Sequence, residues 1–123
     1  MYKLALKEKP LQLVATSDIG WFAAQAFINP SEYAGQSISL AGDDLTYADV
    51  SKAFKNKVGT DLPTTFSFLG SAMMWGIADL GTMFRWFHTD GYGSDIQALK
   101  KTHPGLLSFE EWLEKESKFD TLK

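Results

Sequence analysis

Short apolar runs and helically spaced apolar residues alternate along the first third of the chain. Residues 11–15 form an apolar run with the length of one buried strand. Over 19–28 the apolar residues leave almost no polar face, which predicts a helix covered on nearly all sides, with Asp18 as its N-cap. A further short strand is predicted at 37–42. The order strand, helix, strand with short connections predicts a right-handed crossover and parallel pairing.

Two later helices are predicted from the signals at their ends. Thr46 and Asp49 have the spacing of a capping box with aspartate in place of glutamate, and Gly59 supplies the C-terminal stop. Ser108 and Glu111 form a second capping box ahead of the last helix. The apolar residues predicted on the inner faces are Val50, Ala53, Phe54 and Val58 in the first helix and Phe109, Trp112 and Leu113 in the second.

The region between these two helices holds the longest apolar stretch of the chain. A third strand is predicted at 64–69, followed by one long apolar helix over 70–87. The segment "TDGYGSD" is predicted to be a turn, after which Ser94 or Asp95 caps a short helix. Together these elements predict an α/β fold that is mostly helical, with short parallel strands from βαβ units packed against about five helices.

Length and composition fit a single domain over residues 1–123. The 45% hydrophobic content provides material for a core, and the absence of cysteine excludes thiolate catalysis and Cys-based metal sites. A net charge of −3 gives no attraction to nucleic acid or to an anionic membrane. Asp79 and Arg85 lie inside the long apolar stretch and argue against a membrane span. Without cysteine or the apolar core of a signal peptide, the expected location is cytoplasmic.

The familiar catalytic and phosphate-binding motifs are incomplete in this sequence. Gly20 is the lone glycine where a dinucleotide turn needs several, and Asp18 would repel a phosphate at the start of the helix. Gly91 and Gly93 match only two positions of a G-x-G-x-x-G turn, and no Tyr-x-x-x-Lys pair, P-loop or G-x-S-x-G turn occurs. We therefore predict no catalytic, cofactor-binding or metal-ligating residue. Structural or solvent-facing roles are predicted for the two histidines, His88 and His103.

The long apolar stretch is rich in methionine and aromatic residues. These side chains fall on more than one side of the predicted helix, and a chain of this size has little material to cover both sides. One interpretation is a buried core, and the other is a surface that a ligand or another domain covers, because Met and Trp suit adaptable apolar pockets. The candidate pocket or interface residues are Met73, Met74, Trp75, Met83 and Trp86.

Five segments together resemble the C-terminal half of NmrA-like proteins, which are atypical members of the short-chain dehydrogenase/reductase superfamily. The segments are "LVATSDIG" (13–20), "AFINP" (26–30), "ISLAGDDLTY" (38–47), "GYGSDIQALKKTHPG" (91–105) and "SFEEWL" (108–113). The resemblance implies an N-terminal NAD(P)-binding Rossmann domain and a smaller C-terminal part that closes over the cleft. The family's glycine-rich turn would come before Met1, so the chain resembles only the substrate-side portion and lacks the complete Rossmann sheet. NAD(P) is then expected only together with the missing N-terminal domain.

Three functions follow as alternatives. The first is a non-catalytic C-terminal portion of an NmrA-like regulatory or oxidoreductase-like protein, which shapes the substrate pocket and a partner surface. The second is a stand-alone protein-interaction module that uses the apolar helix, and the third is half of a split NAD(P)-dependent reductase. Enzymatic activity is not expected of this chain alone. The expected partners are the missing nucleotide-binding domain, a second copy of the chain or another protein, with neither nucleic acid nor membrane.

Overall fold

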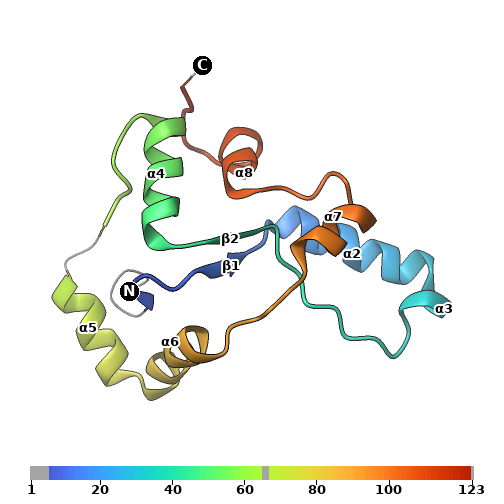
Figure 1. The fold of residues 1–123 in the computed structure, drawn as a ribbon, viewed down its shortest axis with the longest axis horizontal. Coiled ribbons are helices and arrows are strands. Elements are labelled where there is room, and N and C mark those ends of the chain that lie inside the picture. Colours follow the sequence, from blue (N-terminus) through green and yellow to red (C-terminus); the bar gives the residue numbers. More distant parts are fainter. Residues whose placement is uncertain (1–5, 65–66, 123) are drawn as a thin grey trace.

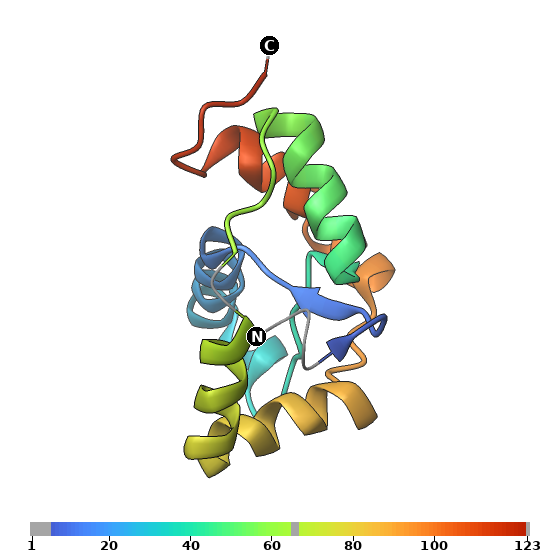
Figure 2. The ribbon, with the colours of Figure 1, turned by 90° about the vertical axis from the view of Figure 1, so that its left-hand side faces the viewer.

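The computed structural model describes residues 6–64 and 67–122, and it is mostly helical (Figure 1). Two short strands, β1 and β2, lie at the centre, and the helices surround them in three groups (Figures 1 and 2). The elements are, in chain order, β1 (Leu11–Leu13), α2 (Thr16–Ile28), α3 (Pro30–Tyr33), β2 (Asp43–Leu45), α4 (Tyr47–Val58), α5 (Ser67–Gly76), α6 (Ala78–Thr89), α7 (Ile96–Thr102) and α8 (Phe109–Lys115).

The two strands pair antiparallel, which corrects the predicted parallel crossover. Leu11 lies opposite Leu45, and Leu13 lies opposite Asp43. The strand predicted at 37–42 is also wrong, since that segment has no regular structure and the strand begins only at Asp43. Leu40 instead packs against the small core between α2 and α7 and Ala41 is buried, whereas Ile38 is exposed. Within the described ranges the expected parallel strands are not present.

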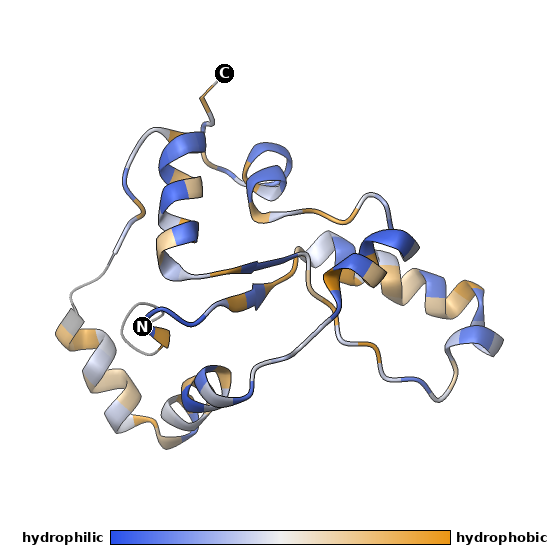
Figure 3. Ribbon diagram, viewed as in Figure 1, coloured by the Kyte–Doolittle hydropathy of each residue, from blue (hydrophilic) through white to orange (hydrophobic). Residues whose placement is uncertain are grey.

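Helix α2 confirms the predicted helix but not its complete burial. Phe27 is 86% exposed and Ile28 is 69% exposed. The helix starts at Thr16 with Ala15 as its N-cap, so Asp18 lies inside the first turn and is not the cap. The surrounding chain is too sparse to cover the far end of this apolar helix, which Figure 3 shows as a largely hydrophobic segment.

The predicted long helix over 70–87 is two helices, α5 and α6. Ile77 has an extended backbone conformation (φ −117°, ψ 96°) that separates them. A Cβ atom on Gly81 would lie 2.7 Å from the carbonyl oxygen of Met74, so this glycine permits the close return of α6 onto α5. The strand predicted at 64–69 is wrong from Ser67 onward, where α5 begins, while residues 65 and 66 lie outside the described part.

The predicted helix ends are confirmed elsewhere. Both capping boxes are present, and Gly59 ends α4 in the left-handed conformation with φ 82°. Asp95 rather than Ser94 caps α7, because its side chain accepts a hydrogen bond from the Ala98 amide. The capping residues thus fix the starts of α4, α7 and α8.

Within the described ranges, the buried side chains form small clusters rather than one large core. One is Phe22, Leu99 and Leu106, between α2, α7 and the segment before α8. Another lies between α4 and α8, where Phe54 and Leu113 are almost fully buried. None of the described side chains of α5 and α6 is buried. The accessible surface is 8545 Å², whereas a compact folded chain of 13.7 kDa exposes about 6,600 Å².

None of the helices in the described ranges is long and apolar enough to cross a membrane.

Candidate functional site

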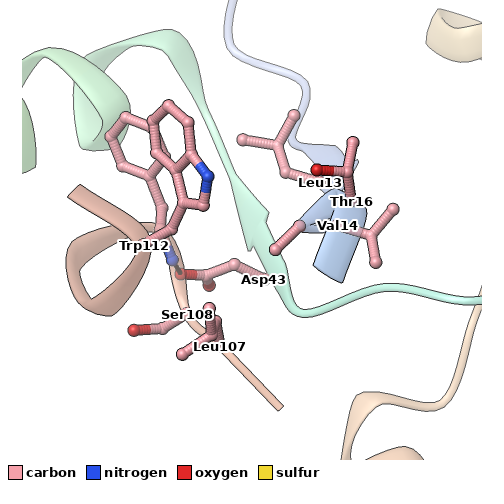
Figure 4. Close-up of a pocket in the computed structure, with 9 residues that line it drawn as sticks. Leu13, Val14, Thr16, Asp43, Leu107, Ser108 and Trp112 are labelled. Carbon is pink, nitrogen blue, oxygen red and sulfur yellow. Dashed lines mark hydrogen bonds between the residues drawn. The ribbon is translucent and has the colours of Figure 1, made fainter. Parts of the chain in front are cut away.

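An apolar cavity of about 250 Å³ lies where the β1–α2 junction, β2 and the start of α8 meet (Figure 4). Leu13 and Val14 line it from the β1 side, and Leu107 and Trp112 line it from the α8 side. Its polar groups are the Thr16 hydroxyl and the side chains of Asp43 and Ser108. Such a lining, mostly apolar with a few polar groups, is typical of small-molecule pockets.

Backbone contacts hold the walls of this cavity together. The Gly42 amide donates to the Leu13 carbonyl at 2.7 Å, and the Phe109 amide donates to Asp43 Oδ2 at 3.0 Å. A Cβ atom on Gly42 would lie 2.2 Å from the Leu107 carbonyl oxygen, so only glycine allows the β2 and α8 segments to approach this closely. The cavity is therefore a product of three segments that lie far apart in the sequence.

A buried carboxylate lies next to this cavity and joins α2 to the α7–α8 connection. Asp18 Oδ1 lies 2.9 Å from His103 Nε2, and Asp18 Oδ2 accepts the Leu107 amide at 3.0 Å. The indole of Trp21 stacks on the His103 ring with centroids 4.0 Å apart and an interplanar angle of 9°. Side-chain exposure is 4% for Asp18 and 14% for His103. This burial supports the structural role predicted for His103 and gives Asp18 a role that its sequence position did not indicate.

The charged groups at the helix ends are shifted by their hydrogen bonds. The backbone amide of Ser108 holds the pKa of the Glu111 carboxyl below its ordinary value, and the Thr46 hydroxyl does the same for the pKa of Asp49. The Glu114 carboxylate raises the pKa of the Lys57 ammonium, which also lies 3.8 Å from Glu110. Asp49 and Glu111 each stabilise the start of their own helix, whereas Lys57 joins α4 to α8 through Glu110 and Glu114; none of these charged groups belongs to the cavity lining.

The five predicted Met and Trp residues lie on α5 and α6 and do not line the apolar cavity. Trp75 is 92% exposed, Met73 48%, Met83 42% and Trp86 41%, while Met74 is half-buried. Trp86 packs edge-on against Tyr92, with ring centroids 5.2 Å apart, at the start of the glycine-containing turn. Their prediction as pocket or interface residues stays a prediction, because the structure places them at a surface without showing what covers it.

The two candidate dinucleotide turns, at Gly20 and at Gly91 with Gly93, do not fit a phosphate. Gly20 lies inside α2 with open space around the position of a Cβ atom, so it provides no close backbone approach. The first turn of α2 already carries the Asp18 carboxylate, and the helix after Gly91 and Gly93 is capped by Asp95. A carboxylate at a helix start takes the place of a bound anion and repels another one. We therefore assign no NAD(P) contact to these residues.

Within the described ranges, acidic and histidine side chains form no group of three or more that could hold a metal ion. Sequence patterns did not predict this cavity, because Leu13, Thr16 and Asp43 belong to no known ligand-binding motif. Phe109 and Trp112 were predicted on the inner face of the last helix, and both line the cavity.

One known protein family matches almost the whole chain. The model of the NmrA-like family matches residues 3–113. This match confirms the resemblance carried by the segments between residues 13 and 113, and it points to an NAD(P)-binding, regulatory or oxidoreductase-like family. The chain belongs to the NmrA-like family.

Proposed function

We propose that this chain is the non-catalytic, substrate-side portion of an NmrA-like protein. It shapes the substrate pocket and packs against a nucleotide-binding domain that supplies the NAD(P) site. The observation that carries the proposal is the exposed apolar surface: large hydrophobic side chains on α2, α5 and α6 lie open, and the accessible surface exceeds that of a compact chain by nearly a third. Apolar surface of this kind marks an interface with another domain or protein.

The apolar cavity supports the pocket-shaping half of the proposal. Its lining is mostly apolar, and the Thr16 hydroxyl and the Asp43 carboxylate are the polar groups that would orient a bound molecule. Its walls are held by a backbone hydrogen bond between Gly42 and Leu13 and by the bond from the Phe109 amide to the Asp43 carboxylate, so the cavity is preformed. A substrate bound between two domains would contact this side through shape and a few polar groups.

Calorimetric titration of the chain with NADP and with NAD tests the missing cofactor site. We expect no measurable binding, because both glycine-containing segments carry a carboxylate where a phosphate would lie. The same titration after mixing with the nucleotide-binding domain of an NmrA-like protein, followed by gel filtration, tests the interface. Micromolar binding of either dinucleotide by this chain alone would overturn the proposal.

A protein-interaction module is the second candidate function, favoured by the exposure of Trp75 and its neighbours on α5 and α6. Both candidates predict an apolar dye-binding surface, but they differ in what covers it. Complex formation with a nucleotide-binding domain favours the first candidate. Stable self-association that such a domain does not displace favours the second.

A further inference from the structure

A second hollow, of about 420 Å³, lies between the N-terminal turn and the α5–α6 pair. Figure 2 shows these two helices and the N-terminal turn at one end of the molecule. Its lining includes Lys7, Arg85 and His88 together with Met74, Trp75 and Phe84. The hollow therefore combines basic groups with flat or flexible apolar side chains, and no carboxylate belongs to its described lining.

The two cations of this hollow have no acidic partner among the described residues. Among the described residues, the lysines that form ion pairs are Lys55, Lys57 and Lys115, and none of them lines the hollow. Lys7 and Arg85 form none, although the chain as a whole carries a net charge of −3. Two unpaired cations that share one hollow in an acidic chain make a local site for an anion. Arginine adds specificity, because its planar guanidinium binds carboxylate or phosphate through two parallel hydrogen bonds.

The apolar side of the hollow is suited to an aromatic ring. The side chain of Trp75 is 92% exposed, and Met74 and Phe84 are half-buried. An indole so exposed can stack on a ligand ring, and methionine adapts to its edge. His88 lines the same hollow, and its Nδ1 atom is buried without a hydrogen-bond partner in the described part of the chain.

We propose that the hollow between Lys7, Trp75 and Arg85 binds an aromatic anion, whose acidic group lies at Lys7 and Arg85 and whose ring lies against Trp75 and Phe84. The acidic group is a carboxylate or a phosphate. This inference goes beyond the proposed function, since the hollow lies on α5 and α6 and shares no lining residue with the apolar cavity.

Calorimetric titration of the whole chain with three matched probes tests the site. The probes are 1-naphthoate, 1-naphthyl phosphate and the neutral 1-naphthamide. We expect one or both anions to bind at least about tenfold more tightly than the amide, because an acidic group gains charge-assisted hydrogen bonds that an amide does not. The preferred anion distinguishes a carboxylate ligand from a phosphate ligand.

Three variants locate the binding. Arg85→Gln and Lys7→Gln are each expected to weaken the preferred anion about tenfold, with little effect on folding because both side chains are exposed. Lys101→Gln is the matched control, since it removes one exposed cation from α7, outside the hollow. Trp75→Ala is expected to weaken all three probes, because it removes the stacking surface and leaves the charges in place.

Several results would overturn the inference: no binding of any probe, equal binding of 1-naphthoate, 1-naphthyl phosphate and 1-naphthamide, or an equal loss in Lys101→Gln. The proposed function is tested separately by complex formation with a nucleotide-binding domain. A complex that forms without anion selectivity would reject this inference alone, whereas selective anion binding without a complex would reject the proposed function.

Discussion

At the scale of single residues, Asp18 is the buried charged residue of the described chain. It is buried and bonded to both the His103 ring and the Leu107 amide. A buried polar group that loses its partner costs about 1–3 kcal/mol. Asp18 therefore contributes to holding α2 against the α7–α8 connection, beside the apolar cluster of Phe22, Leu99 and Leu106.

We predict that Asp18→Ala lowers the free energy of unfolding by about 1–3 kcal/mol, because it leaves the Leu107 amide and the His103 ring without their acceptor. Urea unfolding followed by circular dichroism measures the change. Asp44→Ala is the matched control, since Asp44 is exposed on β2 and its loss should change stability little. Equal effects of the two substitutions would contradict the role given to Asp18.

Two glycines lead to opposite predictions for the same substitution. Gly42→Ala is expected to destabilise the chain by about 1–3 kcal/mol, because the new methyl group would meet the Leu107 carbonyl oxygen. Gly20→Ala is expected to stabilise it by about 0.5–1 kcal/mol, since Gly20 lies inside α2 with open space around it. Thermal unfolding of both variants gives the comparison, and a destabilising Gly20→Ala would contradict the structure of α2.

At the scale of elements, the two capping boxes connect helix stability to pH. Hydrogen bonds from the caps lower the pKa of Glu111 and of Asp49 in the folded chain. A carboxyl whose pKa is lower in the folded than in the unfolded chain stabilises the fold at any pH above its unfolded value. That stabilisation is lost as the pH falls through the folded pKa.

We therefore predict that acid weakens α8 as the pH falls below about 4.3, the ordinary pKa of a glutamate, and α4 below about 3.9, that of an aspartate. Glu111→Gln should flatten this part of the stability curve, because the amide does not titrate. Glu116→Gln is the control, as Glu116 is exposed and lies beyond the last turn of α8. Denaturant unfolding at several pH values gives the curves, and an unchanged curve for Glu111→Gln would count against the capping role.

At the scale of the whole molecule, the three groups of helices share little buried surface. The helices α5 and α6 contribute no buried side chain among their described residues, while α4 and α8 form a cluster of their own. An apolar pair of helices without a packing partner favours association with another surface. Figure 3 shows that much of α5 is hydrophobic.

We predict that the chain self-associates at micromolar concentration and that Trp75→Ser reduces this association without changing stability, since the indole is 92% exposed. Sedimentation velocity over a range of concentrations measures the effect. Lys101→Ala serves as the control for an exposed position on α7, outside α5 and α6. A wild-type chain that stays monomeric at all concentrations would remove the support for an interface on α5.

The sequence alone determined the starts of α4, α7 and α8, the end of α4, the family and the apolar character of the α5–α6 region. Capping boxes and the stop at Gly59 depend on residues at most a few positions apart, so local chemistry decides them. The resemblance to NmrA-like proteins likewise depended only on the order of residues, and the family match confirmed it. The prediction of one domain over residues 1–123 remains a prediction.

Only the tertiary structure decided the strand direction, the break at Ile77 and the role of Asp18. Segment 37–42 could pair in a sheet or pack without regular structure, and Leu40 packs against the α2–α7 core instead of pairing. The partners of Asp18 lie 85 and 89 positions away in the chain, and the close approach at Gly42 involves Leu107. Periodicity reports which side of an element is apolar, but the surface that this side meets depends on contacts between segments far apart in the sequence.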